Sequence, residues 1–233
     1  MKLKEWLGTR YPRFYFKLLL SRSYLSIPVR SSLIRRYLAG THQPKLQLGA
    51  GRNHMSGWLN SDYFAKHPKF IYINVCHPFP LPDDVFERVY SEHMIEHIPQ
   101  KSGQFMLNEC FRVMKSGARI RIETPDLEKI SNLYSTRDQL ESHRYIQWHH
   151  QEFADKTHAP TICFAINSIM RNWDHCFLYD EEMLRQALER AGFVNIQRHS
   201  WGQTHDPEFQ NISQRRGVAA TEFETLAMEA AKP

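Results

Sequence analysis

The 233-residue sequence predicts an α/β fold, a three-layer sandwich with helices packed on one central sheet. Two observations lead to this prediction. Short apolar runs of strand length alternate with longer segments of helical periodicity, and one strand-like run leads directly into a glycine turn. Hydrophobic residues make up 42% and charged residues 24% of the chain, as in ordinary globular domains. A chain of this length buries a sizeable core, so we expect one domain with appendages.

The glycine turn lies in the run K-L-Q-L-G-A-G at positions 45–51. Gly49 and Gly51 lack a Cβ, so the chain can turn sharply and a ligand can approach its backbone amides. A second short apolar run ends at Asp62, whose carboxylate is suited to the two hydroxyls of a ribose. The two segments together indicate a nucleotide-type site. His54 stands where a dinucleotide motif would have its third glycine.

The connection between these two segments is short. Adjacent parallel strands usually need a dozen or more connecting residues, and too few separate Gly51 from Trp58. We therefore expect the first crossover helix to be missing or to be a single turn. This loss weakens the usual anion site at a helix N-terminus and leaves Arg52 or the N-terminal arm to supply positive charge.

The remaining elements follow in order along the chain. We expect strands at 70–75, 86–91, 118–124, 193–201 and 225–230, and helices at 29–39, 100–115 and 180–191. Lys115 stands in the last turn of the second helix and Gly117 just past its end, as helix-end preferences predict. Arg119 and Arg121 alternate with isoleucines, so we expect one face of the sheet to be only partly covered.

Residues 1–43 form a basic N-terminal arm. Before Gln47 there are ten Lys or Arg residues and one acidic residue, a net charge of +9. The whole chain has a net charge of +5, so the residues from Gln47 onward contribute −4. We expect helices interrupted at Pro12 and Pro28. A lid docked on the domain and contact with an anionic membrane surface are both open. A nucleic-acid partner is not expected, because no dedicated binding module is present.

Two further motifs complete a series of four. They read F-E-R-V-Y-S-E-H-M-I-E-H-I at 86–98 and E-C-F-R-V-M-K-S-G-A-R-I-R-I-E-T-P-D-L at 109–127. Together with the glycine turn and G-W-L-N-S-D at 57–62, they resemble the class I S-adenosylmethionine-dependent methyltransferases, and specifically the small bacterial methyltransferase-11-like branch. The resemblance covers residues 45–232. It implies a Rossmann-like, mostly parallel sheet with one antiparallel strand near its edge, and a methyltransferase domain over residues 44–233.

The resemblance also implies the cofactor and its site. S-adenosylmethionine would be the methyl donor and S-adenosylhomocysteine the product. The cofactor-binding residues would be Gly49, Ala50, Gly51, Arg52, Asp62, Asn74, Val75, Ser91 and Glu92. The glycine turn would hold the methionine moiety, the carboxylate the ribose, and the Asn-Val pair the adenine, where the family usually has Asp in place of Asn. The Ser-Glu pair would line the side of the sulfonium.

His93 is the candidate catalytic base. It follows the strand at 86–91, and open α/β sheets bind ligands at the carboxyl ends of their strands. An imidazole can accept a proton at neutral pH. The alternative is a capping or cofactor-lining role without proton transfer. Methyl transfer depends on a held donor and an aligned acceptor, and a base helps only when the acceptor is a hydroxyl or a protonated amine.

Two alternative functions remain open from the sequence. His93, Glu96 and His97 spell H-x-x-E-H, the inverted zinc-metallopeptidase motif, although a zinc peptidase leaves the glycine turn unexplained. The short first connection and the neutral Asn74 suggest instead a non-catalytic nucleoside-binding partner of a membrane-associated glycosyltransferase complex. The methyltransferase interpretation requires no metal.

Residues 126–174 are expected to form a helical insertion that covers the acceptor. His149 and His150 are suited to sugar or phosphate oxygens, and the aromatic residues of the insertion would either stack on a sugar or build a small helical cap. The resemblance implies a small or lipid-linked acceptor, with a sugar hydroxyl in cell-envelope or surface-polysaccharide biosynthesis as the first expectation.

Composition also predicts the location of the protein. The four cysteines form no C-x-x-C pair, which indicates reduced packing residues. No run of about 18 apolar residues and no signal-peptide cleavage pattern is present. We therefore expect a cytoplasmic protein, with the basic arm as the part able to contact the inner face of the membrane.

Overall fold

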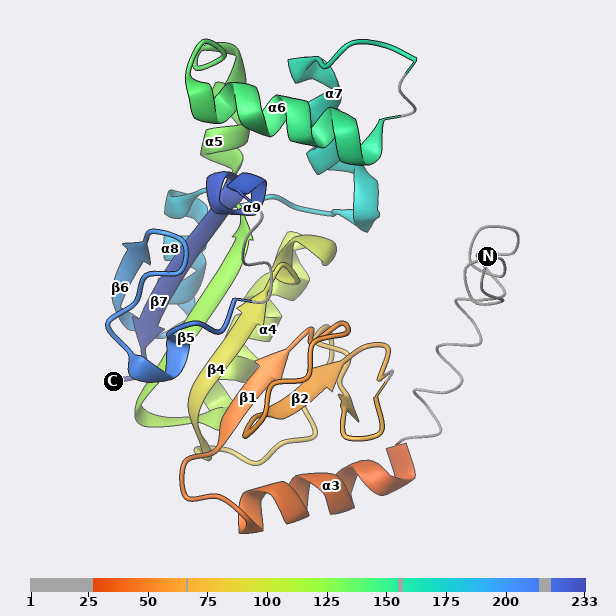
Figure 1. Ribbon diagram of the computed structural model, residues 1–233. Helices are drawn as coiled ribbons and strands as arrows, with labels where there is room; N and C mark the ends of the chain where they lie inside the picture. The colour runs from red at the N-terminus through yellow and green to blue at the C-terminus, as the bar shows by residue number, and fades with distance from the viewer. Residues whose placement is uncertain (1–26, 66, 155–156, 214–218) are drawn as a thin grey trace, which may run out of the picture.

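The computed structural model describes residues 27–65, 67–154, 157–213 and 219–233, and the predictions for residues 1–26 lie outside that part of the chain. Figure 1 shows the arrangement of the elements. The strands are β1 (Lys45–Leu48), β2 (Leu59–Asp62), β3 (Ile71–Tyr72), β4 (Phe86–Glu92), β5 (Met114–Pro125), β6 (Val194–His199) and β7 (Thr225–Ala231). The α-helices are α3 (Ile27–Ala39), α4 (Gln100–Val113), α5 (Leu127–Ser131), α6 (Leu140–Phe153), α7 (Ile162–Arg171), α8 (Glu181–Ala191) and α9 (Ala219–Glu224). Short 3₁₀ helices are η1 (Ile95–His97), η2 (Asn132–Tyr134), η3 (Asn172–Asp174) and η4 (Pro207–Phe209).

One seven-stranded sheet organises the fold, with the strand order β3-β2-β1-β4-β5-β7-β6. The pairs from β3 to β5 are parallel, and β7 runs antiparallel to both β5 and β6. This confirms the mostly parallel sheet with one antiparallel strand near its edge. The chain goes from β1 to β2 on one side, whereas β4 pairs with the other side of β1. Such a switch point leaves a crevice at the carboxyl ends of the strands.

The first crossover has no helix. Residues 49–58 contain only turns and irregular backbone, yet β1 and β2 still pair in parallel, with Leu46 opposite Leu59. The predicted loss of this helix is therefore confirmed. The loop that replaces it reaches the carboxyl ends of both strands, and so brings the glycine turn beside the end of β2.

The predicted end of the second helix was wrong. Helix α4 stops at Val113, and Met114 already has extended backbone angles (φ −84°, ψ 146°) and pairs with Phe86 of β4. Lys115 and Gly117 therefore belong to β5. Gly117 has a φ of 78° and donates its N–H to Lys232 O at 2.9 Å, so strand pairing at this edge replaces the expected helix cap.

Other predicted elements are present with small changes at their ends. Helix α8 begins where Asp180 Oδ1 accepts from Met183 N–H at 2.8 Å and ends at Gly192, whose φ is 101°. Helix α3 begins at Ile27, with Pro28 in the first turn, where proline is tolerated. The third strand is shorter than expected and contains two residues.

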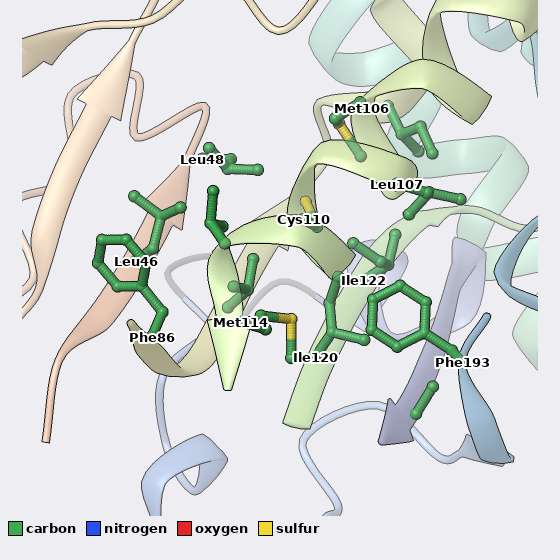
Figure 2. Packing of buried hydrophobic residues seen from close by; sticks show 14 of the residues in the cluster. Leu46, Leu48, Phe86, Met106, Leu107, Cys110, Met114, Ile120, Ile122 and Phe193 are labelled. Carbon is green, nitrogen blue, oxygen red and sulfur yellow. The ribbon is translucent and has the colours of Figure 1, made fainter. Parts of the chain in front are cut away.

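Helices α4 and α8 pack on one face of the sheet. Figure 2 shows Met106, Leu107 and Cys110 of α4 against Ile120 and Ile122 of β5, and all five are fully buried. Burying each large apolar side chain contributes about 1.5–3 kcal/mol. Burial also raises the pKa of the Cys110 thiol, which fits the predicted packing role.

The opposite face of β5 carries ion pairs. Arg121 is 1% exposed and lies between two buried carboxylates, Glu123 at 2.7 Å and Glu229 at 2.6 Å. Arg119 is part-exposed and contacts Asp206 at 3.5 Å and Glu229 at 3.0 Å. The expectation of a partly covered face holds at Arg119 and is wrong at Arg121, because one carboxylate of β5 itself and one of the neighbouring β7 neutralise its charge.

A group of helices, α5 to η3, extends beyond the carboxyl ends of β4 and β5 (Figure 1). It has an apolar cluster of its own, whose buried members are Ile130, Leu133, Tyr145, Ile146, Ala165 and Ile169. Helix α6 contacts α7 and α9. The helical insertion is thus present, while the domain boundaries stay a prediction. In the part of the chain that the structure describes, no helix has the length and apolar character to span a membrane.

Candidate active site

A cavity of about 580 Å³ lies at the carboxyl ends of β1, β2 and β4. Six of the predicted site residues line it: Gly49, Gly51, Asp62, Asn74, Val75 and His93. The sequence analysis missed several further lining residues, namely Tyr63, Phe64, Met94, His97, Ile98 and Trp173. Tyr63 and Met94 each follow a predicted residue directly in the chain, which is the signal that would have found them. Trp173 comes from the insertion and has no such signal.

The glycine turn brings β1 close to the segment after β4. Gly49 has a φ of 69°, and a Cβ at this position would lie 2.4 Å from Met94 Cγ and 2.7 Å from Met94 Cβ. Gly51 has a φ of 59°, and a Cβ there would meet no protein atom within 4 Å. The first glycine is therefore needed for packing and for its backbone angle. The second opens onto the cavity.

Asp62 ties this turn to the end of β2. Its Oδ2 accepts from Gly51 N–H at 2.7 Å, and its Oδ1 accepts from Phe64 N–H at 2.6 Å. The residue is 9% exposed. Asp62 also lines the cavity, so hydroxyl groups of a ligand bound there can reach its carboxylate.

Asn74 lies at the opposite end of the cavity. Its Oδ1 accepts from Cys76 N–H at 3.1 Å, which fixes a local turn and uses one of the two lone pairs of the amide oxygen. The neighbours Ile73 and Val75 give this end an apolar lining. An apolar slot with one amide group suits a flat heteroaromatic ring.

Four other predicted cofactor residues do not line the cavity. Ala50 is buried in a small apolar cluster, Arg52 is exposed, and Ser91 is fully buried. Glu92 accepts from Ser213 Oγ at 2.8 Å. Neighbouring positions in an extended chain point to opposite sides, so a motif of consecutive residues places only some of its members in one cavity.

His93 is held at the end of β4 in an unusual backbone conformation. Its φ is 45°, which is uncommon for a residue other than glycine and is often found at functional sites. Its N–H donates to Glu123 O at 2.8 Å. The ring contacts Glu96 Oε1 through Nδ1 and Thr225 Oγ1 through Nε2, both at 3.2 Å.

Glu96 is fully buried beside this histidine. Burial by itself would raise the pKa of Glu96, but the contact with His93 and the charges of His93 and His97 lower it below its ordinary value. An ionised carboxylate can only accept, so it favours a hydrogen on Nδ1. The Thr225 hydroxyl donates to Thr221 O at 2.7 Å, so Nε2 also faces an acceptor. The contact is at ion-pair distance and is not a well-aligned hydrogen bond.

The H-x-x-E-H run does not form the α-helix of a metallopeptidase. Helix η1 is a single 3₁₀ turn over Ile95–His97, and His93 precedes it. The motif needs both histidines on one face of an α-helix, and here His93 lies outside the single helical turn. The zinc-peptidase interpretation is not supported.

A second cavity, of about 510 Å³, lies between the first one and the helical insertion. It shares three lining residues with the first: His93, His97 and Trp173. Its other walls include Trp148, His149, Phe153, His175, Thr221 and Glu224. Of the two histidines predicted to recognise an acceptor, His149 lines this cavity. His150 does not, and its ring contacts His158 O at 2.5 Å.

Glu224 provides a negative charge in the second cavity. It accepts from Tyr145 Oη at 2.7 Å and lies 3.7 Å from His149 Nε2. Burial would raise the pKa of Glu224, but the nearby His149 ring, the bond from Tyr145 and the charge of His93 lower it. Burial also lowers the pKa of His175. The cavity combines an ionised carboxylate with aromatic walls.

Comparison with known proteins identifies the domain. Residues 46–122, which contain the glycine turn, Asp62 and His93, match the family model of the methyltransferase domain. The chain carries the methyltransferase domain of class I S-adenosylmethionine-dependent enzymes. The protein is thus an S-adenosylmethionine-dependent methyltransferase.

Several solved structures are similar to this methyltransferase. A methyltransferase from Archaeoglobus fulgidus is 16% identical, with 94% of this chain and 99% of that chain covered, at a TM-score of 0.48. A possible histamine N-methyltransferase from Thermotoga maritima is 14% identical, with 98% of both chains covered, at 0.47. Phosphoethanolamine N-methyltransferase 2 of Haemonchus contortus, in complex with S-adenosylmethionine, is 14% identical at 0.47. The alignment covers 88% of this chain and 52% of that one. Likenesses this distant say nothing about the acceptor, and no curated protein matches the chain.

The residues of the first cavity fit S-adenosylmethionine. The cavity has the size of small-molecule sites and a largely apolar lining with few polar groups. One end has the Asp62 carboxylate next to a glycine that opens onto the cavity. The other end has an apolar slot with an amide. This polarity matches a ribose next to an amino-acid chain, with an adenine at the far end.

Proposed function

We propose that this methyltransferase acts on a hydroxyl group of a small or lipid-linked acceptor bound in the second cavity, with a sugar hydroxyl as the first candidate. The observation that carries the proposal is the shared wall. His93, His97 and Trp173 line both cavities, so a donor in one and an acceptor in the other would meet at these residues. Holding two reactants in this way can lower the barrier by about 7–11 kcal/mol.

In the first cavity, the chain's own residues would orient the cofactor. S-adenosylmethionine supplies an electrophilic methyl group when it is bound. Gly49 and Gly51 would hold its methionine part, Asp62 its ribose hydroxyls, and Asn74 and Val75 its adenine. The support for these roles is that all five residues line one cavity in this order from the turn to the apolar slot.

His93 would accept the proton of the acceptor hydroxyl. The support is its place in the wall shared by the two cavities and the contact of Nδ1 with the Glu96 carboxylate, which orients the ring. The Thr225 hydroxyl beside Nε2 donates to Thr221 O, so Nε2 would have to leave Thr225 in order to accept a proton. Thr225 follows directly after Glu224, a wall residue of the second cavity. Proton acceptance by a positioned side chain contributes typically about 10²- to 10⁴-fold to a rate.

The walls of the second cavity suit a sugar. Trp148, Phe153 and Trp173 offer aromatic surfaces, while His149 and the Glu224 carboxylate offer hydrogen-bonding groups for hydroxyls. A carboxylate accepts stronger hydrogen bonds than a neutral oxygen, which favours an acceptor rich in hydroxyl groups. A role in cell-envelope or surface-polysaccharide biosynthesis would follow from such an acceptor.

The described part of the basic arm supports docking on the domain. Ile34 is 5% exposed, and Tyr37 Oη donates to Lys45 O at 2.9 Å. Arg35 and Arg36 are exposed on the same helix. We propose that these arginines contact an anionic membrane surface on the side of the amino end of β1, away from the two cavities (Figure 1). Co-sedimentation with phosphatidylglycerol vesicles tests this, and binding that is unchanged by replacing both arginines with glutamate would contradict it.

Titration calorimetry tests the cofactor site. Asp62→Ala should weaken S-adenosylmethionine binding by about 1.5–3 kcal/mol, roughly 10- to 150-fold, through the loss of charge-assisted hydrogen bonds. Asp62 also holds the glycine turn, so the free energy of unfolding is measured alongside. Asp83→Ala is the matched control, because its carboxylate pairs with Arg112 away from the cavity. Unchanged affinity in a folded Asp62→Ala protein would refute the ribose role.

Mass spectrometry of an envelope extract incubated with enzyme and cofactor tests the transfer. We expect S-adenosylhomocysteine together with an acceptor that is heavier by one methyl group. His93→Ala should lower turnover with little change in cofactor affinity, whereas His150→Ala should leave both unchanged. A protein that binds S-adenosylmethionine but releases no S-adenosylhomocysteine with any extract would instead favour a non-catalytic role.

A further inference from the structure

Glu96, His97 and His175 form a cluster of potential metal ligands. One candidate ligand atom of each side chain lies within 4.8 Å of those of the other two. The residues come from two segments, η1 and the stretch after η3, which are far apart in the sequence and meet beneath the insertion. The rings of His97 and His175 are 4.8 Å apart, centroid to centroid, and inclined at 74°.

Both histidines are oriented by backbone carbonyl groups. His97 Nδ1 lies 2.7 Å from Trp173 O, and His175 Nδ1 lies 2.5 Å from Ile169 O. A carbonyl oxygen can only accept, so each Nδ1 carries the hydrogen and each Nε2 carries the lone pair. Metal-binding histidines are typically held in this manner, with the second ring nitrogen donating to a carbonyl or a carboxylate.

Glu96 is a buried acceptor with spare capacity. Its side chain is fully buried, and its Oε2 accepts from Thr124 Oγ1 at 3.1 Å. Its Oε1 has only the poorly aligned contact with His93 and no hydrogen bond that satisfies it. A buried oxygen in this condition is costly unless another group or an ion completes its shell.

We propose that Glu96, His97 and His175 bind one divalent first-row transition ion such as Zn²⁺. Two imidazoles and one carboxylate are a common ligand set for such ions. Bonds of about 2.1 Å at tetrahedral angles would place the ligand atoms about 3.4 Å apart. The ligand atoms therefore have to approach one another by up to about 1–1.5 Å. His97 and His175 are only half-buried, which leaves room for this movement.

The site differs from the one that the H-x-x-E-H motif suggests. It replaces His93 by His175, a residue of the insertion, and leaves His93 at the end of β4. His97 lines both cavities and His175 lines the second. An open coordination position would therefore face the acceptor cavity. If the proposed function holds, a hydroxyl bound there would lose its proton more readily, because a metal ion lowers the pKa of a bound oxygen.

Metal binding is tested on the full chain without any methyl-transfer assay. The untagged protein is dialysed against a chelator and then titrated with ZnCl₂ by calorimetry and with CoCl₂ by visible absorption. We expect one ion per chain, a cobalt spectrum typical of nitrogen and oxygen ligands, and a rise in melting temperature with zinc. His97→Ala and His175→Ala should each weaken binding by at least about 100-fold, whereas His150→Ala should not change it.

Two results would overturn the proposal. One is that the wild-type protein binds no zinc in the micromolar range. The other is that it binds zinc with equal affinity in the His97→Ala and His175→Ala variants. Circular dichroism shows whether each variant is folded, and His175→Gln is a milder second variant. The number of zinc ions bound per wild-type chain tests the proposal even if every variant unfolds. Calorimetry with S-adenosylmethionine on the same metal-free protein tests the cofactor site separately.

Discussion

Replacing Gly49 by alanine tests whether the glycine turn is built as the structure describes. At a φ of 69°, an L-residue with a Cβ costs about 1–2 kcal/mol. The new Cβ would also lie 2.4 Å from Met94 Cγ and 2.7 Å from Met94 Cβ. These atoms are close to the backbone and cannot swing aside, so Met94 has to shift together with its segment. Overpacking of this kind costs about 1–3 kcal/mol. We expect a total loss of about 2–5 kcal/mol.

Gly57→Ala is the matched control. Gly57 has a φ of 79°, and a Cβ there would meet nothing within 4 Å. Alanine at position 57 therefore destabilises the protein by about 1–2 kcal/mol through its backbone conformation, without any steric overlap. Both variants gain equally from the reduced freedom of the unfolded chain, so this contribution cancels in the comparison.

The assay is equilibrium unfolding in urea, with thermal unfolding as a second measurement. Gly49→Ala should be less stable than Gly57→Ala by about 1–3 kcal/mol, which corresponds to roughly 2–12 °C in melting temperature for a chain of this size. Met94 lines the cofactor cavity, so Gly49→Ala should also weaken S-adenosylmethionine binding. Equal stability of the two variants would refute the close contact between the turn and Met94.

Three further substitutions test other parts of the fold. Glu109→Gln should lower stability at pH 7, because bonds from Arg112 lower the pKa of Glu109 in the folded state. In urea unfolding the difference should shrink as the pH falls below about 4 and vanish below the lowered pKa, and a difference that does not shrink would contradict this. Arg121→Met should cost about 3–5 kcal/mol by leaving buried Glu123 without its ion pair and Glu229 with only its contacts to Arg119 and His199, against less than about 1 kcal/mol for part-exposed Arg119→Met. Asn60 does not line the cofactor cavity, and Asn60→Ala should lower the free energy of unfolding by about 2–4 kcal/mol in the same assay. A loss of stability below about 1 kcal/mol would show that its hydrogen bonds are dispensable.

The sequence predicted the sheet well, because its strands and α8 carry strong local signals. Helix α8 has an acidic N-cap and a glycine at its end, and each decides its boundary locally. The end of α4 was missed for a non-local reason. Val113 and Met114 continue the apolar helical pattern, but Met114 pairs with Phe86, which is far away in the chain. Periodicity does not report such pairings.

The candidate site was predictable in part. The glycine turn, Asp62 and His93 were found because each ends a strand, and parallel strands bring their carboxyl ends to one edge. The sequence analysis placed the aromatic and histidine residues of the insertion over the acceptor, but it did not place Trp173 beside the cofactor cavity or His175 beside Glu96. They come from the insertion, and its path back over the sheet depends on packing among α6, α7 and α9. No residue spacing encodes that path.

The missing crossover helix explains why β2 contains so many buried polar groups. A helix would satisfy the backbone of residues 49–58 by its own hydrogen bonds, and without it those groups need other partners. Asn60, 1% exposed, bonds to Met55 N, Met55 O and Trp58 O at 2.8–2.9 Å. Asp62 Oδ2 accepts a hydrogen bond from Gly51 N–H at 2.7 Å. The carboxylate proposed to bind the ribose is thus also the one that holds the turn, and a bound ribose would draw on the same oxygen atoms. Cofactor binding and the order of the turn should therefore be coupled, so that Asp62→Ala affects both directly, whereas Asn60→Ala weakens cofactor binding only through the order of the turn.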